Sequence, residues 1–373
     1  MHGIHRTTDS GKSWHQFNTG LIGTHVRGLI SVNNTLYVYA AERGLVSSSD
    51  SGESWTLVTT DTFGEQLMVG FDDILYTTAS NSNLMNPRRA RSSDLRLMRF
   101  SEQDKKLTFI QGMPDLRKIN SFDDGWIRLN KPLEPVSDTK TESLNEDLPS
   151  APKKSGGITF DSRIEIKTRV KIASFAVSDT AYYVEFQHQL FRWKPGTSEW
   201  YDTGLIDEDT RDKFKNSEDL ADTSTFKLAV SGETVYVGKR NGHLIRSFDE
   251  GDTWNDVTAN LPFSVDRFHA IAFAGKSVYV ATDKGVTRSS NGTDWQTLTD
   301  AEGTPLVMGQ FAVDGTTVYG ETEQYIYQLD RDTGTWQQVT PEIPYPVTCL
   351  DVDGNTLYVG TFGRGVLHFA LDE

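Results

Sequence analysis

Acidic and basic side chains recur at one place in this sequence, just after short apolar stretches centred on a tyrosine. Two carboxyl groups held roughly 5–10 Å apart could act as the acid and the nucleophile or base of a glycoside hydrolase. A ring of cations at the same level could attract an anionic ligand. The carboxylates are Glu42, Glu185, Glu321 and Glu323, and the cations are Arg43, Arg88, Arg89, Arg91, Arg240, Lys284 and Arg364.

Both patterns also have a structural explanation. Glycine directly follows Arg43, Lys284 and Arg364, so glycine can close a turn while the long cation extends into solvent. We favour this interpretation. Among the eight histidines there is no cluster with metal-ligand spacing, and no nucleophile elbow or phosphate loop is present. The sequence therefore predicts no metal and no cofactor, and it favours a protein without catalytic activity over an enzyme.

The elements that must position these residues are marked by a repeated turn sequence. Ser48–Trp55 reads Ser-Ser-Asp-Ser-Gly-Glu-Ser-Trp, and the pattern Ser/Thr-x-Asp-x-Gly-x-Ser/Thr-Trp recurs at Thr7–Trp14 and Ser247–Trp254. The Asp carboxylate can accept hydrogen bonds from its own turn, glycine supplies a positive φ, and Trp starts the next strand. The residues assigned to these structural turns are Asp9, Trp14, Asp50, Trp55, Asp249 and Trp254.

The tryptophans keep a fixed period. The spacing is 41 residues from Trp14 to Trp55, from Trp254 to Trp295 and from Trp295 to Trp336, within the roughly 40–50 residues of a four-stranded propeller blade. In the last two copies Ser290 and Arg331 stand where Asp is expected. A tyrosine in the second strand counts the repeats: Tyr37, Tyr76, Tyr183, Tyr236, Tyr279, Tyr319 and Tyr358. We predict an all-β fold, a seven-bladed β-propeller of four-stranded antiparallel blades.

With these turns and this period, the chain resembles the Asp-box, or bacterial neuraminidase repeat (BNR), β-propellers. That family includes sialidases, the sortilin ectodomain, xyloglucan hydrolases and photosystem II assembly factors. The resemblance covers almost the whole chain outside two insertions. It implies the fold but no single activity, because one propeller scaffold hosts unrelated functions.

The sialidase-like members use three arginines to hold the substrate carboxylate, a Tyr–Glu nucleophile pair and an Asp acid/base. In this chain, Arg27 lies in a first strand, ten residues before the central tyrosine. The equivalent positions of the other repeats hold Gln66, Ala173, Phe226, His269, Gly309 and Thr348. The arginine triad is therefore missing, which favours binding over sialidase-like catalysis.

We expect one propeller domain over residues 1–373, interrupted by insertions at about 114–170 and 206–225. Lys131–Gly157 is rich in Pro, Ser, Glu and Lys and is predicted to be mobile, and Glu208–Phe214 could form a short helix. Residues 1–20 are expected to close the ring with residues 347–373. Two stretches compete for the third strand of that blade, Gly3–Thr8 and Gly365–Ala370.

The stretch Asp351-Val352-Asp353-Gly354-Asn355 superficially resembles a calcium loop, but no glutamate stands at the twelfth position. Asp-Gly recurs at the same place in Asp314-Gly315. We therefore predict type I′ hairpin turns at both places.

The composition of the chain excludes some classes of binding partner. A net charge of −15 argues against nonspecific nucleic-acid binding, which depends on Lys and Arg neutralising phosphates. The single Cys349 excludes an internal disulfide, and no apolar stretch approaches a membrane span. No signal peptide is present in this chain. The sequence leaves the compartment open, although the resemblance favours an extracytoplasmic or periplasmic location. We expect a monomer.

In a four-stranded blade (strands A to D), loops B–C and D–A share one rim, and turns A–B and C–D share the other. The long insertions and the loop Ser80–Arg96 fall on the B–C/D–A rim, and variable loops on a rigid scaffold commonly bind ligands. We therefore predict a non-catalytic scaffold that binds a protein segment or a glycan, possibly anionic, on this rim. The alternatives are a glycoside hydrolase or lyase of the sialidase-like group, and an assembly factor for a larger complex.

Overall fold

The computed structural model describes residues 5–6, 15–16, 21, 24–41, 43–60, 63–69, 74–79, 95–101, 104, 106–116, 119, 172–207 and 226–371. The chain divides into one unit of residues 1–119 and 171–373 and another of residues 120–170. The following description concerns the first unit. The predicted mobile segment Lys131–Gly157 and the predicted helix Glu208–Phe214 lie outside the described residues.

In the sheets of the described residues, strands that follow one another in the chain pair antiparallel. One parallel pair, between β22 (Gln296–Asp300) and β26 (Thr335–Gln338), joins two of these sheets into one of eight strands. The first three sheets are β3 (Val26–Val32), β4 (Thr35–Ala40), β5 (Gly44–Ser48) and β6 (Thr56–Thr59); β7 (Phe63–Val69), β8 (Leu75–Ala79), β9 (Leu97–Ser101) and β10 (Lys106–Phe109); and β11 (Ile172–Val177), β12 (Tyr182–Phe186), β13 (Gln189–Trp193) and β14 (Tyr201–Ile206). The next are β15 (Lys227–Ser231), β16 (Thr234–Gly238), β17 (Leu244–Ser247) and β18 (Asn255–Asp256), followed by a 3-10 turn η2 (Thr258–Asn260); and β19 (Phe268–Ala274), β20 (Ser277–Thr282), β21 (Gly285–Ser289) and β22 (Gln296–Asp300). The last are β23 (Gln310–Asp314), β24 (Thr317–Glu321), β25 (Ile326–Leu329) and β26 (Thr335–Gln338); β27 (Val347–Asp353), β28 (Thr356–Thr361) and β29 (Gly365–Ala370); and the pair β1 (His5–Arg6) and β2 (His15–Gln16).

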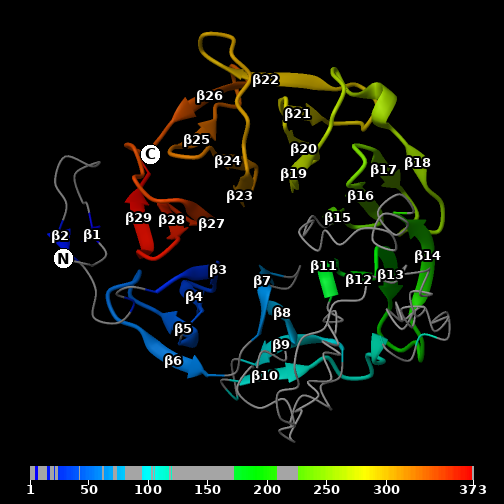
Figure 1. Ribbon diagram of the computed structural model, residues 1–373, viewed down its shortest axis with the longest axis horizontal. Coiled ribbons are helices and arrows are strands. Elements are labelled where there is room, and N and C mark those ends of the chain that lie inside the picture. Colours follow the sequence, from blue (N-terminus) through cyan, green and yellow to red (C-terminus); the bar gives the residue numbers. More distant parts are fainter. Residues whose placement is uncertain are drawn as a thin grey trace, which may run out of the picture. The chain divides into compact units, whose positions relative to one another are not determined.

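The first strands of successive sheets contact one another in a closed cycle. β3 contacts β7, β7 contacts β11, and the series continues through β15, β19, β23 and β27 back to β3. Figure 1 shows the first strands innermost and the fourth strands outermost within this unit. The sheet of β27, β28 and β29 has three strands among the described residues. This cyclic arrangement of antiparallel strand sets is a β-propeller. Among the described residues, we find no helix with the length and hydropathy of a membrane span.

The second strands form the middle of each sheet, and their sequences explain why. They are rich in β-branched and aromatic residues, which suit a strand covered on both faces. Each carries one of the predicted tyrosines, and every one of these is buried: Tyr37, Tyr76, Tyr183, Tyr236, Tyr279, Tyr319 and Tyr358. The tyrosine marker therefore identifies the second strand correctly.

The tryptophans at the start of the fourth strands pack between sheets, as their common spacing predicts. Trp254 Nε1 donates to the Thr203 carbonyl of β14 at 2.9 Å. The Trp295 ring lies 6.2 Å from the Tyr236 ring of β16. Trp55 packs against a core cluster that includes residues of its own sheet and of β27, β28 and β29. Trp336 is buried in a cluster that includes Leu298 of β22. Each tryptophan thus closes the outer part of a seam between two sheets.

The A–B turns differ from the predicted type. Gly354 and Asn355 form the turn between β27 and β28, and only Gly354 has a positive φ, of 53°. Gly315 does the same between β23 and β24, with a φ of 58°. A type I′ turn needs a positive φ at both central residues, and a type II′ turn needs it at the first alone. The type I′ prediction is therefore wrong at these two turns, because the aspartates end the strands and glycine starts the turn.

The structure also decides between the two candidates for the third strand of the last sheet. Gly365–Ala370 is β29, and it pairs with β28. His5–Arg6 pairs instead with His15–Gln16, and β1 contacts β29. Trp14 and Asp9 lie outside the described residues. Closure of this sheet by residues 1–20 remains a prediction.

The seam between β27 and β3 joins the last sheet to the first. The Ser31 amide donates to Asp351 Oδ2 at 2.5 Å, and the Ser31 hydroxyl donates to Asp353 Oδ2 at 2.7 Å. Burial raises the pKa of Asp351 to about 7, although the hydrogen bond from Ser31 acts in the opposite direction. The neighbouring carboxylates of Asp353 and Asp314 add to the increase.

Truncating Trp336 tests the seam packing. Trp336 is 2% exposed, so Trp336→Ala should lower the free energy of unfolding by about 3–5 kcal/mol, as for other buried large aromatics. Urea denaturation followed by circular dichroism measures the change. Tyr201→Ala, at a 46% exposed position, is the control. Equal small losses in both variants would contradict the assignment of Trp336 to the core.

Stability should fall as pH rises through neutrality. The folded protein keeps a proton on Asp351 up to pH of about 7, whereas the unfolded chain loses it near the ordinary value of 3.8, so the stability contributed by this proton is full at low pH and declines between the two values. Asp351→Asn should flatten the decline in melting temperature between pH 5 and pH 8. The exposed Asp332→Asn is the control. A slope unchanged by Asp351→Asn would refute the assignment.

Candidate binding face

The two rims of the propeller are defined by the antiparallel order of the strands. We call the A–B and C–D turns the Asp-box rim; it includes residues 33–34, 49–55, 194–200, 248–254, 290–295 and 330–334. The B–C/D–A rim carries the loops between second and third strands and the connections to the next sheet. In the described residues it includes 24–25, 41, 43, 187–188, 239–243, 261–267, 283–284, 301–309, 322–325, 339–346 and 362–364.

The intact turns on the Asp-box rim satisfy their own carboxylates. Asp50 accepts the Ser54 amide at 2.8 Å and the hydroxyls of Ser48 and Ser54 at 2.6 Å each. Asp249 makes the same bonds with Ser247 and Thr253. The hydroxyl hydrogen bonds lower the pKa of each carboxyl to about 2. These aspartates therefore stabilise their own turns.

The two decayed turns keep this chemistry at a shifted position. Asn291, not Ser290, takes the place of the aspartate, because its Oδ1 accepts the amides of Thr293 and Asp294 at 2.9 Å each. Asp330, not Arg331, accepts the amides that follow it, from Asp332 at 2.8 Å and from Thr333 at 3.1 Å. Counting back from the tryptophan fails here because the spacing between the acceptor and the tryptophan differs from that of the intact copies.

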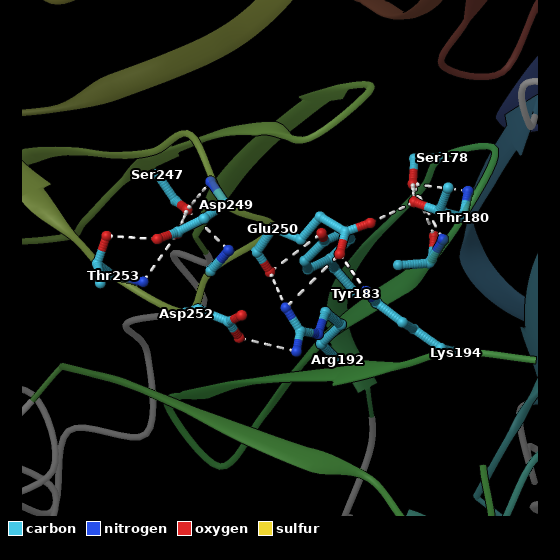
Figure 2. A network of polar contacts seen from close by, with 12 residues as sticks. Ser178, Thr180, Tyr183, Arg192, Lys194, Ser247, Asp249, Glu250, Asp252 and Thr253 are labelled. Atoms are coloured by element: carbon cyan, nitrogen blue, oxygen red, sulfur yellow. Dashed lines mark hydrogen bonds and ion pairs between the residues drawn. The ribbon is translucent and has the colours of Figure 1, made fainter.

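One C–D turn also fastens two sheets together (Figure 2). Glu250, with a positive φ of 57°, accepts the Thr180 hydroxyl at 2.5 Å and pairs with Lys194. Its backbone carbonyl accepts Arg192 Nη1 at 2.8 Å, and the Arg192 guanidinium also pairs with Asp252 at 2.9 Å. The β15–β18 turn is therefore bonded to β13 and to the A–B turn of the β11–β14 sheet. The charged side chains of this network therefore hold two neighbouring sheets together.

On the B–C/D–A rim, Arg240 lies in a buried ion cluster. Its Nη2 is 2.6 Å from Glu185 Oε1 and its Nη1 is 3.4 Å from Asp207 Oδ2. The side chains of Glu185 and Asp207 are fully buried, and that of Arg240 is 5% exposed. Burial lowers the pKa of the adjacent Lys227, an effect that Glu185 opposes. The predicted carboxylate and the predicted cation thus neutralise each other within the protein.

The other predicted cations occupy varied surroundings. Lys284 pairs with Asp283 at 2.7 Å and with Asp266 at 3.1 Å, and its side chain is 44% exposed. Arg43 is exposed. Arg364 lies over the Tyr345 ring, with its Cζ 4.9 Å from the ring centroid. Arg88, Arg89, Arg91 and the carboxylate of Glu42 lie outside the described residues.

Sequence reasoning missed an aromatic patch on this rim. Phe362 is 60% exposed, yet its ring lies 4.1 Å from the His25 ring. The Phe362 amide donates to the Pro346 carbonyl at 3.0 Å, which brings the Arg364–Tyr345 pair to the same loop. We call His25, Tyr345, Phe362 and Arg364 the aromatic patch. A phenylalanine before the Gly-Arg-Gly of a B–C loop is the signal that could have revealed it.

Glu321 is the carboxylate whose ionisation is most perturbed on this rim. Glu321 ends β24 and is 8% exposed. Its backbone carbonyl accepts the Gly309 amide at 2.8 Å, but its carboxyl group accepts no hydrogen bond from any described residue. Burial raises its pKa to about 7, and the nearby charge of the exposed Glu323 adds to the increase. A carboxyl group that titrates near neutrality can bind a cation or act as an acid. Within the described ranges, no three His, Cys, Asp or Glu side chains gather as a metal site.

The family described as the DUF6242 beta propeller domain matches residues 2–96 and 211–351 of this chain. A xyloglucanase from Paenibacillus sp is 28% identical over an alignment that covers 47% of this chain. The chain spans only 21% of that relative's length. The whole relative's activity is therefore no description of this chain.

Solved structures share the fold at low identity. YCF48 from Cyanidioschyzon merolae is 10% identical, with a TM-score of 0.51 and coverage of 93% of this chain and 96% of its own. A second YCF48 structure, bound to D1 peptide, is 9% identical with a TM-score of 0.51 and covers 94% of both chains. An inactive virginiamycin B lyase from Staphylococcus aureus with quinupristin is 8% identical, with a TM-score of 0.52 and coverage of 100% and 99%. At these identities the likeness shows the fold alone.

Removing the cation of the buried cluster tests its structural role. Arg240→Met should lower the free energy of unfolding by about 3–5 kcal/mol, because it leaves Glu185 and Asp207 buried without their partner. Lys284→Met, at a half-exposed ion pair, is the matched control and should leave the free energy of unfolding nearly unchanged, because solvent screens the pair. Urea denaturation at neutral pH measures both. Similar small losses in the two variants would contradict the structural assignment of Arg240.

Proposed function

This chain belongs to the family described as the DUF6242 beta propeller domain, and on that premise we propose that it is a non-catalytic binding scaffold. Its ligand is a segment of a partner protein, held on the B–C/D–A rim. The aromatic patch of His25, Tyr345, Phe362 and Arg364 carries this proposal.

The patch offers what peptide recognition needs. An exposed aromatic ring supplies apolar contact area with few rotatable bonds, and a neighbouring arginine supplies hydrogen-bond donors. The centroid of the His25 ring lies 4.1 Å from that of the Phe362 ring, and this contact holds the exposed ring in place before a ligand arrives. Pre-positioning reduces the entropy lost on binding.

The partner's charge is the finer part of the proposal. We propose that the segment is anionic and that Arg43, which is exposed, and Arg364, which is half-buried, contribute to its attraction. Binding through these cations should weaken as salt rises, because the field of charges near the surface is screened over a Debye length of about 8–10 Å. A glycan bearing carboxylate or sulfate would show the same dependence.

We also propose that the ring has seven blades of the Asp-box type, the last completed by residues 1–20. The cyclic contacts of β3, β7, β11, β15, β19, β23 and β27 support this count. The bonds of Asp50 and Asp249 support the Asp-box assignment.

A glycoside hydrolase is the second candidate, and two observations favour it. Glu321 has a pKa of about 7 beside Glu323, as a general acid would, and the relative from Paenibacillus sp is named a xyloglucanase. Hydrolysis of xyloglucan oligosaccharides that is lost in Glu321→Gln would establish this candidate in place of the scaffold.

Peptide selection tests the scaffold proposal. A display library of random 12-residue peptides is selected on the intact chain, and synthetic peptides are measured by fluorescence anisotropy. Phe362→Ala should weaken the selected peptides at least tenfold, because it removes the central apolar contact. Phe248→Ala is the matched control, since Phe248 is 52% exposed on the Asp-box rim. Selection that yields no peptide, or peptides indifferent to Phe362→Ala, would refute the proposal.

A further inference from the structure

Glu185 and Glu321 occupy the same place in two different sheets. Each follows the central tyrosine of its second strand by two residues, after Tyr183 and Tyr319. Each pairs across its sheet with the first strand, Glu185 with Ser174 and Glu321 with Gln310. In the other sheets the equivalent residues carry no charge: Tyr39, Thr78, Gly238, Ala281 and Gly360.

The side chain at this place faces the seam with the next sheet. A Cβ added at Gly238 would stand 2.7 Å from the Phe268 ring of the following sheet. One added at Gly360 would stand 2.3 Å from Cys349 of the adjoining first strand and 2.8 Å from Val26 of the following sheet. Glu185 fits this rule, because it accepts the Phe226 amide of the following sheet at 2.8 Å. A carboxylate here is buried between two sheets and needs donors from them.

Glu185 has those donors. Its oxygens accept the Ser174 hydroxyl at 2.8 Å and the Phe226 amide at 2.8 Å, and Arg240 Nη2 lies 2.6 Å away. Arg240 comes from the B–C loop of the following sheet, four residues after Tyr236. The protein itself thus shows how this position accommodates an ionised carboxylate.

Glu321 lacks every one of these donors among the described residues. Its carboxyl lies against Gly309, so that a Cβ added there would be 2.7 Å from Oε2. The residue four after Tyr358 in the following sheet is Phe362, so no guanidinium stands where Arg240 stands. Gln310 donates to the Thr348 carbonyl at 2.9 Å rather than to Glu321. The Glu321 carboxyl is therefore removed from water as the Glu185 carboxyl is, but no cation of the described residues compensates for this loss of hydration.

We propose that Glu321 binds a guanidinium or ammonium group of the partner segment, in the place that Arg240 fills beside Glu185. This deepens the proposed function and rests on it, since it assigns an arginine or lysine to the bound segment. The exposed carboxylate of Glu323 attracts the same cation. The exposed ring of Phe362, on the loop of the following sheet, offers a surface for the aliphatic stem of that side chain.

Binding of the cation should depend on pH, because it requires the ionised form of the Glu321 carboxyl. The cation binds the ionised carboxylate, so its affinity should rise about tenfold from pH 6 to pH 8 for a group whose pKa is about 7. Glu323 is the charged residue whose field acts on Glu321. Gln310 and Thr348, on the adjoining first strands, do not titrate.

The probe is the tripeptide acetyl-Gly-Arg-Gly-amide, with its citrulline analogue as the uncharged match. Carboxyl carbon-13 NMR of the glutamate-labelled chain follows Glu321, identified as the resonance lost in Glu321→Gln. We expect the arginine peptide to lower the pKa of Glu321 and to bind about tenfold more tightly at pH 8 than at pH 6. The citrulline peptide should do neither, and Glu321→Gln should abolish the pH dependence.

A second variant supplies the missing cation from the chain. Phe362→Arg places a guanidinium at the position of Arg240, so it should lower the pKa of Glu321 without any peptide and weaken the arginine peptide at least tenfold. Arginine binding that is independent of pH and unchanged by Glu321→Gln would overturn the proposal. A pKa decrease produced equally well by calcium chloride would overturn the assignment of a side-chain cation.

The two proposals can fail separately. Selected peptides that depend on Phe362 but bind Glu321→Gln as tightly as the parent chain would leave the scaffold standing and remove the cation site. Selection without any peptide dependent on the aromatic patch would remove the scaffold itself.

Discussion

The close approach of neighbouring sheets at their first and second strands is the constraint on which the other features depend. Each sheet is apolar on both faces and is buried by two neighbours, so the sheets form a closed cycle of contacts. Near the ends of the second strands the space is so limited that Gly238 lies directly under the Phe268 ring and Gly360 lies against Val26 and Cys349. A larger or charged side chain at this place must find its partners in the seam, as Glu185 does.

Polar bonds across the seams then fix how one sheet stands against the next. Apolar packing is non-directional, whereas hydrogen bonds to a buried donor or acceptor have strict geometry. The Glu250 turn binds Arg192 and Thr180 of the neighbouring sheet, and Asp351 accepts the Ser31 amide where the last sheet meets the first. The polar groups named here on the Asp-box rim therefore stabilise the arrangement of the sheets. The B–C/D–A rim instead retains Glu321 without a donor among the described residues and an exposed Phe362.

The sequence predicted the features that recur in every sheet, but it did not reveal the contacts that form in only one seam between two sheets. The places of the tyrosines and tryptophans could be predicted because each sheet has the same packing requirement, which recurs at a constant interval in the sequence. The aspartate positions failed in the later copies, since Asn291 and Asp330 act at a different distance from the tryptophan than Asp249 does. Glu185 and Arg240 were both identified, but under separate hypotheses of catalysis and anion binding. They are 55 residues apart, and only the packing of two sheets shows that they form one ion pair.

The same comparison explains why a buried, unpartnered carboxyl favours function over stability. In the Glu185 seam the cost of removing a carboxylate from water is offset by Arg240, so the cluster contributes to one rigid arrangement. In the Glu321 seam, folding removes the carboxyl from water without a compensating cation among the described residues. The result is the raised pKa of this side chain. A ligand cation would therefore meet an acceptor that is already largely desolvated and whose backbone is held in β24. Most of the interaction energy would then be available to the complex, because little reorganisation of the protein remains to be done.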